Sequence, residues 1–377
     1  MSTETEIRTR ISAVWRREAA IVVATLTRLT RDLGVAEELA QEALVVALER
    51  WPTTGIPDNP GAWLLTTGRH LALDRIRREQ LAERKADVIR EHTTPAEGPS
   101  IEDVLDDPIG DDVLRLAFIA CAPVLSMDAR VALTLRVLCG LSTDEIARAF
   151  LTTSPTIGQR IVRAKRALAG EPFELPRREA LVARTASVLQ VVYLVFNEGY
   201  SATSGEDLVR RDLCGEALRM GRMLVSWLPG EPEVVGLLAL MEIQHSRAPA
   251  RTDAEGNPVL LLDQDRDLWD REAITRGLAA LTRAHLLGGR GPYVLQAEIA
   301  ACHGRARRAE DTDWSAIAAL YGELAARSPS PVVELNRALA VSMAEGPEAG
   351  LAILDTIADA PALKSYHLLS AARGDML

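Results

Sequence analysis

The chain has 377 residues, of which 47% are hydrophobic and only 4% aromatic, and its formal net charge is -10. This length predicts two or three domains, and the abundance of Ala, Leu and Arg beside scarce aromatic and β-branched runs predicts an all-α fold. The four cysteines are too widely spaced for a zinc site or a disulfide framework, so neither a metal nor a cofactor is expected. No signal peptide is recognisable, and no apolar stretch reaches the roughly 20 residues of a membrane span. We therefore expect a cytoplasmic protein without membrane contact.

Charge is distributed unevenly along the sequence. Residues 1–90 hold 14 basic and 13 acidic side chains, a net charge of +1, and residues 113–170 hold 8 basic and 3 acidic ones, a net charge of +5. Between them, residues 91–112 hold 8 acidic side chains and no basic one, and the other 21 basic and 29 acidic side chains give residues 171–377 a net charge of -8. A negatively charged protein therefore concentrates positive charge in one short segment, which is typical of nucleic-acid binding.

Helical periodicity begins near residue 12 and continues to residue 50. Gly34 is expected to end a first helix, and a second is expected from Ala36 to Trp51. An acidic and polar surface accompanies the second helix and consists of Asp32, Glu37, Glu38, Gln41 and Glu42. Paired carboxylates can serve an enzyme, but no histidine, nucleophile or glycine-rich phosphate loop accompanies them, so no catalytic residue is expected.

Asn59 and Pro60 form an N-cap and N1 pair that predicts a further helix, running to about Gln80. Its apolar side carries Trp63 and Ile76. Its basic residues are Arg69, His70, Arg75, Arg77 and Arg78. This second basic helix is a moderate indication of nucleic-acid binding, and its lone histidine implies no metal site.

Residues 141–168, LSTDEIARAFLTTSPTIGQRIVRAKRAL, predict a helix-turn-helix. Ser142 and Glu145 form a capping box for the first helix, and Ser154 with Pro155 is expected to start the second. The face of the second helix that is expected to be buried consists of Ile157, Ile161, Ala164 and Leu168. The residues expected to contact bases and phosphates are Ser154, Thr156, Gln159, Arg160, Arg163, Lys165 and Arg166. Caps, turn length and charge segregation together favour DNA binding over an ordinary solvated basic face.

From about residue 180 onward, recurring turn signals predict stacked helices. The helices expected near Asp313 and Pro347 begin 34 residues apart, which is the period of tetratricopeptide repeats, so we interpret this half as TPR-like. Residues 250–265 are expected to form a hairpin or a long loop. Tyr193, Phe196 and Tyr200 would form one apolar stripe that packs inside this half or against residues 113–168, while the neighbouring Asn197 and Glu198 either serve a polar site or end a helix.

Taken in order, these modules resemble the extracytoplasmic-function sigma factors of bacterial RNA polymerase. The pattern D-x-x-x-AEE-x-x-QEA at 32–43, the basic helix at 60–79 and the helix-turn-helix at 141–168 carry the resemblance. LVFNEGYSATSG (194–205), DLCGEALRMGRML (212–224) and SPSPVVELNRALAV (328–341) are similar to the subgroup with a C-terminal TPR-like extension. The resemblance implies sigma region 2 at 1–90, an acidic flexible linker at 91–112, sigma region 4 at 113–170 and the helical extension at 180–377.

The same resemblance implies a protein that binds core RNA polymerase and directs promoter recognition and transcription initiation, with the extension regulating or supporting its activity. The acidic surface would dock on the clamp helices of the largest polymerase subunit, the basic helix at 60–79 would face the −10 element, and the helix after Ser154 would read the −35 element. The loop at 52–61 would receive a flipped-out base, although it contains no aromatic residue. The alternative is a stand-alone helix-turn-helix regulator with a TPR-like sensor domain, which would have no need of the acidic surface.

Overall fold

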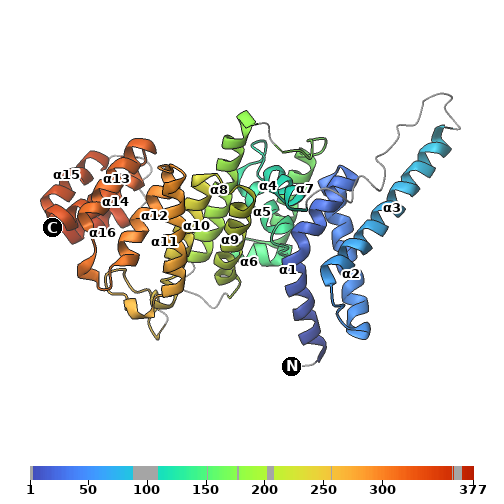
Figure 1. Ribbon diagram of the computed structural model, residues 1–377, viewed down its shortest axis with the longest axis horizontal. Helices are drawn as coiled ribbons and strands as arrows, with labels where there is room; N and C mark the ends of the chain where they lie inside the picture. The colour runs from blue at the N-terminus through green and yellow to red at the C-terminus, as the bar shows by residue number, and fades with distance from the viewer. Residues whose placement is uncertain are drawn as a thin grey trace. The chain divides into compact units, whose positions relative to one another are not determined.

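The computed structural model describes residues 3–87, 109–150, 152–175, 178–201, 208–255, 257–358, 360 and 367–377. It consists of two compact units, Met1–Leu194 and Val195–Leu377. Within the described residues, the regular structure is helical, and the only β contact is an isolated antiparallel bridge between Thr252 and Pro258. The predicted all-α fold is therefore confirmed (Figure 1).

The first unit begins with three long helices that pack on one another: α1 (Thr3–Thr30), α2 (Leu33–Thr54) and α3 (Pro60–Asp87). The buried face of α1 carries Ile11, Trp15, Val22 and Leu26, spaced so that they recur along one side of the helix. Figure 1 shows α1 and α2 side by side, with the C-terminal part of α3 extending away from both. The core of this module consequently lies between α1, the length of α2 as far as Trp51, and the first half of α3.

The break between α1 and α2 differs from its predicted position. It falls at Arg31, whose φ is 56°, and Asp32 caps α2 by accepting a hydrogen bond from the Val35 amide at 2.9 Å. Gly34 lies in the first turn of α2, so the expectation that it ends a helix was wrong: an aspartate cap decided the boundary. The predicted start of α3 is confirmed, since Asn59 Oδ1 accepts from the Ala62 amide at 3.0 Å, but this helix continues to Asp87.

Four shorter helices form the second module of this unit: α4 (Ile109–Ala120), α5 (Met127–Val137), α6 (Thr143–Ala149) and α7 (Ser154–Ala167). The capping box of Ser142 and Glu145 is present at the start of α6. The cap of α7 is Thr153, which accepts from the Thr156 amide at 3.4 Å, so Ser154 lies one residue inside the helix and is not its cap. Residues 91–108 of the predicted linker lie outside the described residues, and its last four residues form the first turn of α4.

Helix α8 (Arg178–Ser201) follows. Its Ser187 donates to the Cys121 carbonyl at 2.8 Å and accepts from Arg130 at 3.0 Å, which holds this part of α8 within the first unit. Among the described residues, the segment Ala180–Tyr200 of α8 is the one helix that is long and apolar enough to cross a membrane by length and composition. Core helices pass the same test, and 44% of this segment is buried in the protein.

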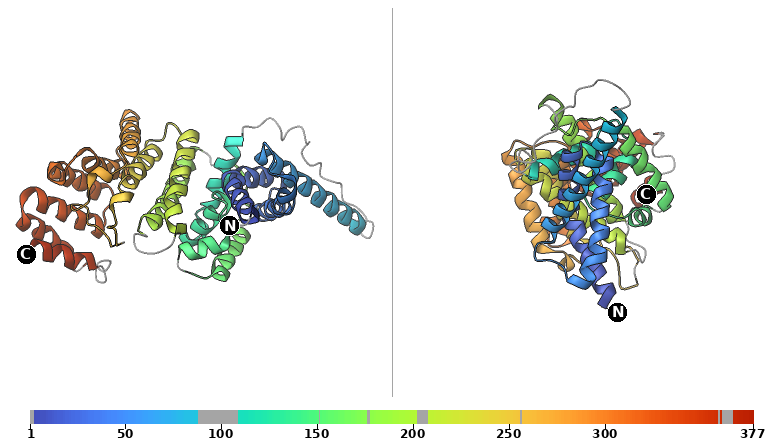
Figure 2. Two further views of the ribbon diagram at one scale, coloured as in Figure 1. Left: turned by 90° about the horizontal axis from the view of Figure 1, so that it is seen from below. Right: turned by 90° about the vertical axis from the view of Figure 1, so that its right-hand side faces the viewer.

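The second unit is a succession of packed helices (Figures 1 and 2). They are α9 (Leu208–Trp227), α10 (Pro232–His245), α11 (Arg271–Leu286), α12 (Pro292–Arg305), α13 (Trp314–Arg327), α14 (Pro331–Glu345), α15 (Pro347–Ile357) and α16 (His367–Met376), with 3-10 turns η1 (Ala248–Ala250), η2 (Arg266–Leu268) and η3 (Ala309–Asp311). The described residues 251–255 and 257–265 of the predicted hairpin or loop form a loop with the isolated bridge Thr252–Pro258. The TPR-like interpretation stays an interpretation.

The aromatic stripe of α8 is not solvent-exposed. Phe196 is fully buried and Tyr193 and Tyr200 are half-buried. The rings of Phe196 and Tyr200 stack with their centroids 5.5 Å apart. Both of these rings belong to the second unit, whereas Tyr193 belongs to the first. An interdomain role for the stripe stays a prediction.

Gly140 joins the two modules of the first unit at close range. Its φ is +67°, and a Cβ placed on it would lie 3.0 Å from the Ala19 Cβ and 3.1 Å from the Trp15 Nε1 of α1. We expect Gly140→Ala to lower the melting temperature of the full-length protein, because alanine adds backbone strain of roughly 1 kcal/mol and a clash with α1.

Gly170→Ala is the matched control for thermal unfolding. This glycine has a φ of +84°, and no other atom lies within 4 Å of the position that an added methyl group would take, so its substitution adds backbone strain alone. Equal losses of melting temperature for the two variants would contradict a close approach of α1 to Gly140.

Candidate polymerase and nucleic-acid interface

The exposed side of α7 carries most of the residues predicted to contact DNA. At about 100° per residue, Thr156, Gln159, Arg160, Arg163 and Arg166 fall on one stripe. Gln159, Arg163 and Arg166 are exposed, and Thr156 and Arg160 are half-buried. The opposite face, with Ile157, Ile161, Ala164 and Leu168, is buried as predicted. The helix thus holds a cationic stripe outward by burying the other side.

Two residues of the predicted DNA-contact set lie off this stripe. Lys165 is nine residues from Thr156, which places it half a turn away from the stripe. Its Nζ donates to Glu37 Oε2 of α2 at 2.9 Å. Ser154 lies on the same side as Lys165 and donates to Asp144 of α6. The helical period alone would have separated these two residues from the others.

Glu37 is a buried acid at the meeting point of two modules. It is 6% exposed and accepts from Arg136 Nε of α5 at 2.8 Å as well as from Lys165. Burial alone would raise the pKa of Glu37, but the charges and hydrogen bonds of Arg136 and Lys165 outweigh it and hold the pKa below the ordinary value of 4.5. A residue predicted to bind polymerase and a residue predicted to bind DNA are therefore paired with each other.

Other ion pairs join the same two modules. Arg28 of α1 lies 3.1 Å from Asp112 of α4, whose side chain is 2% exposed. Arg16 of α1 pairs with Glu145, the acid of the α6 capping box. Together with Glu37, these pairs connect α1 and α2 to α4, α5, α6 and α7 along their length.

The outer side of α2 keeps an exposed acidic surface. Glu38 and Glu42 are exposed, and Gln41 is half-buried beside them. The sequence interpretation missed three further residues on the same side of the helix: Val45, Leu48 and Glu49, which lie 7, 10 and 11 residues after Glu38. The side chain of Val45 is 52% exposed and that of Leu48 is 36% exposed. Exposed apolar residues at helical spacing beside acids were the sequence signal for them. We call Glu38, Glu42, Val45, Leu48 and Glu49 the acidic face.

The basic residues of α3 do not share one side of the helix. His70 and Arg77 are seven residues apart, so they lie on the same side, and both are exposed. Arg75 points toward α2, where it donates to Glu38 at 3.2 Å. Arg78 is exposed and donates to the Asp74 carbonyl at 3.3 Å. Arg69 is half-buried, and its Nε has no hydrogen-bond partner among the described residues.

A tryptophan pair lies beside the loop that was expected to receive a base. Helix α2 runs to Thr54, so residues 52–54 of this predicted loop are helical. Trp51 is buried, and its ring meets that of Trp63 edge to face with centroids 5.2 Å apart. These rings supply, from the flanking helices, the aromatic character that the loop itself lacks.

Removal of the Glu37 charge is a direct test of the connection between the modules. We expect Glu37→Gln to lower the free energy of unfolding by about 3 kcal/mol at neutral pH, because Arg136 and Lys165 would stay buried without a counter-charge. Since the folded pKa of Glu37 is depressed, its contribution is fully present above its ordinary value of 4.5 and is lost as the pH falls through the folded value.

Denaturant unfolding of both proteins at pH 7 and at acidic pH checks this, and the difference between them should shrink below pH 4.5. Glu38→Gln is the control, because its pair with Arg75 is exposed and should contribute less than about 1 kcal/mol. A Glu37 variant as stable as the Glu38 variant would show that the buried pair does not hold the modules.

Known families match three successive parts of the chain. The sigma-70 region 2 family matches residues 14–81, and the sigma-70 region 4 family matches residues 115–168. The first match contains α2, most of α3 and the acidic face, and the second contains α5, α6 and α7. A family of unknown function, DUF6596, matches residues 184–285 in the second half.

Individual relatives are similar to different shares of the chain. A protein of Rhizobium meliloti (strain 1021) carrying the name "uncharacterized protein" is 46% identical over 367 residues, which cover 94% of this chain and 84% of the relative. The probable ECF RNA polymerase sigma factor SigI of Mycobacterium tuberculosis is 34% identical over 157 residues, 41% of this chain and 53% of the relative. The ECF RNA polymerase sigma factor SigK of Mycobacterium ulcerans is 29% identical over 155 residues, 39% of this chain and 77% of the relative.

No solved structure is significantly similar to the chain. The two sigma-70 regions occur in the order that the sequence motifs indicated, and two sigma factors are similar to about two fifths of the chain. The chain belongs to the extracytoplasmic-function sigma factors of RNA polymerase, with an additional C-terminal helical domain.

Proposed function

We propose that this sigma factor binds core RNA polymerase through the acidic face of α2 and promoter DNA through α3 and α7, in the cytoplasm and without catalysing a reaction itself. The observation that carries this proposal is the separation of charge in the first unit: the acidic face projects from α2, and the cationic stripe projects from α7. Two surfaces of opposite charge suit two partners of different chemistry.

The DNA contacts follow from helix geometry. A recognition helix presents its N-terminal and central residues to the edges of bases, so Thr156, Gln159, Arg160 and Arg163 would read the −35 element and Arg166 would contact phosphate. Arg160 lies 3.2 Å from Asp128 of α5, an exposed pair that DNA can replace at little cost. On α3, His70 and Arg77 form the side available to the −10 element.

The core contact rests on the acidic face. Val45 and Leu48 supply apolar area, and Glu38, Glu42 and Glu49 surround it with carboxylates, which is the usual anatomy of a protein interface with a polar rim. Asp32 has a structural role as the cap of α2, and Glu37 reaches a partner only if its pair with Lys165 opens.

The closed arrangement of the two modules is, in this proposal, the form that is not engaged with a promoter. Elements named −35 and −10 are numbered 25 positions apart, which corresponds to about 85 Å along B-form DNA. Helix α7 cannot occupy the distant element while Lys165 is 2.9 Å from α2. Binding of both elements therefore requires the pairs of Glu37, Arg28 and Arg16 to break.

The stand-alone regulator is not favoured. The chain matches the sigma-70 region 2 and region 4 families, and α2 presents an acidic face that a regulator without polymerase contacts does not need.

Association with core polymerase followed by run-off transcription tests the proposal in the full-length chain. We expect Glu38→Ala/Glu42→Ala to reduce association with core polymerase at least ten-fold, because two charges of the acidic face are lost. Arg163→Ala should leave this association unchanged and reduce promoter-specific transcripts, since an arginine that contacts bases contributes about 1–3 kcal/mol of discrimination.

Glu348→Ala, which removes an exposed acid of α15, is the control for both measurements. A wild-type chain that neither associates with core polymerase nor starts transcripts at any promoter would overturn the proposed function.

A reversible cross-link tests whether the modules must open. A Cβ on Gly34 would lie 4.0 Å from the Lys165 Cβ, within the range of a disulfide. We expect oxidised Gly34→Cys/Lys165→Cys to lose promoter-specific transcription and to regain it on reduction, because the bond holds α7 against α2.

The two single cysteine variants under the same conditions are the controls for the native thiols, of which Cys121, Cys139 and Cys214 are buried and Cys302 is half-buried. Full transcription by the cross-linked protein would show that the closed arrangement is compatible with promoter binding.

A further inference from the structure

Three arginines alternate with two aromatic rings in the second unit. The guanidinium carbon of Arg251 lies 3.6 Å from the ring centroid of Tyr200. That of Arg247 lies 5.8 Å from the ring centroids of both Tyr200 and Trp269, and that of Arg266 lies 4.9 Å from Trp269. We call these five residues the arginine–aromatic ladder. It places three positive charges in succession along one path.

The ladder is held in place by neutral acceptors. Arg247 donates to the Tyr200 hydroxyl through Nε at 3.2 Å, and Arg251 donates to the Tyr200 carbonyl. Arg266 donates to the carbonyls of His303 and Ala306, both at 3.0 Å, and to Thr312 Oγ1 at 3.0 Å. These bonds fix the positions of the guanidinium groups without supplying any negative charge.

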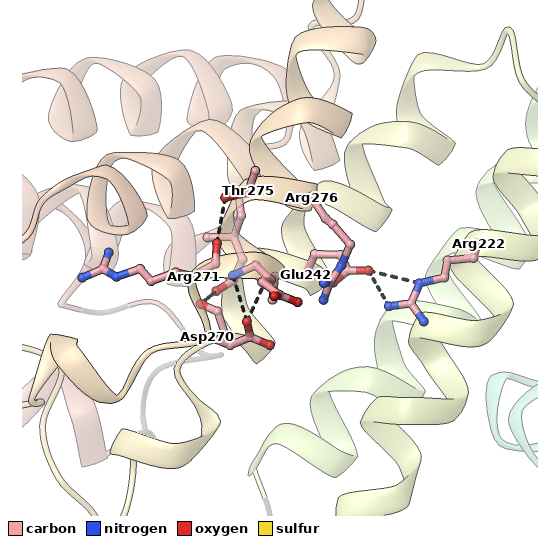
Figure 3. Close-up of polar contacts among 10 residues, drawn as sticks. Arg222, Glu242, Asp270, Arg271, Thr275 and Arg276 are labelled. Atoms are coloured by element: carbon pink, nitrogen blue, oxygen red, sulfur yellow. Dashed lines mark hydrogen bonds and ion pairs between the residues drawn. The ribbon is translucent and has the colours of Figure 1, made fainter.

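Several other arginines of this unit have carboxylate partners. Arg222 of α9 pairs with Oε1 of the buried Glu242 at 2.6 Å, and Arg276 of α11 pairs with its Oε2 at 3.1 Å (Figure 3). Arg290 pairs with Glu298 at 2.9 Å, and Arg337 pairs with Glu334 at 2.9 Å. Within the described part of the chain, by contrast, no carboxylate forms an ion pair with any arginine of the ladder.

The absence of a counter-charge is costly at Arg266. This residue is 4% exposed, and a buried charge without a partner of opposite sign is strongly unfavourable. The nearby Asp311 is itself bound to Arg308 at 3.2 Å. The faces of aromatic rings attract cations but do not neutralise them, so the ladder retains net positive charge.

Several polar atoms beside the ladder also lack partners. Arg266 Nε, Trp269 Nε1 and His303 Nδ1 are buried with no hydrogen-bond partner among the described residues. Burial, together with the charges of Arg247 and Arg266, lowers the pKa of His303 to about 4, so this imidazole is neutral at pH 7. Arg247, Arg251 and Tyr200 are half-buried, so a ligand from solvent can reach one end of the ladder.

We propose that the arginine–aromatic ladder binds an oxyanion, a phosphate or carboxylate group of a small molecule, and that Arg247 and Arg251 contact it directly. Guanidinium groups present paired N–H donors that match the oxygen atoms of both anions. The third cation, Arg266, is fixed deeper and adds to the field that attracts the ligand. Tyr200, Trp269 and the three arginines all lie within residues 184–285, the stretch that matches the family of unknown function.

Calorimetric titration of the full-length protein with inorganic phosphate or with succinate, at constant ionic strength maintained with sodium chloride, tests this proposal. We expect saturable binding of one anion per chain and a rise in melting temperature with anion concentration. Binding of phosphate alone indicates a phosphate-bearing ligand, binding of succinate alone indicates a carboxylate-bearing one, and either result supports the site.

Arg247→Gln and Arg251→Gln should each weaken binding at least ten-fold. Arg276→Gln is the matched control, because it removes an arginine of the same unit that already has a carboxylate partner. The affinity of this variant for the anion should equal that of the wild type. Two ladder variants are used so that a folding defect in one, detected by circular dichroism, leaves the other as the test. Binding of neither anion by the wild type, or equal binding by all three variants, would overturn the proposal. This outcome is independent of core binding and transcription.

Discussion

One carboxylate, that of Glu37, lies where the two modules of the first unit meet. It accepts from Arg136 at 2.8 Å and from Lys165 at 2.9 Å, and all three side chains are largely shielded from water. Shielding from water strengthens the attraction between Glu37 and its two cationic partners, and it also makes any one of these charges costly when it is buried alone. The three side chains are therefore stable either paired with one another or fully exposed to water, and a half-open state with an unpaired buried charge is unfavourable. The use of α2 by polymerase and of α7 by DNA is consequently coupled, in the proposed function, through Glu37 together with the pairs of Arg28 and Arg16.

Gly140 and the peripheral ion pairs support the same contact. The absence of a side chain at Gly140 lets Trp15 and Ala19 of α1 approach the turn before α6, and Arg16 reaches the acid that caps this helix. Glu145 therefore stabilises the start of α6 and also forms an ion pair with α1. The N-caps of α2 and α7, Asp32 and Thr153, are local to each helix and involve no residue of the other module.

The second unit handles arginine in two different ways. Glu242 neutralises two arginines in a buried network, which is a stable structural arrangement. The arginine–aromatic ladder holds three arginines on rings and carbonyls and leaves their charge available. Under the inference above, this domain binds an anion at Tyr200, Arg247 and Arg251.

The sequence by itself determined the all-α fold, the capping box at Ser142, the start of α3 at Asn59 and the buried face of α7, because caps and helical periodicity are local properties that a few neighbouring residues define. It also indicated the sigma-70 regions through motifs whose order is visible along the chain. Only the tertiary structure decided that Glu37 is paired with Lys165 and that Tyr200 lies between Arg247 and Arg251. Those contacts join residues up to 128 positions apart, and pairings at such separations depend on how helices pack, which no local pattern of charge or hydrophobicity specifies.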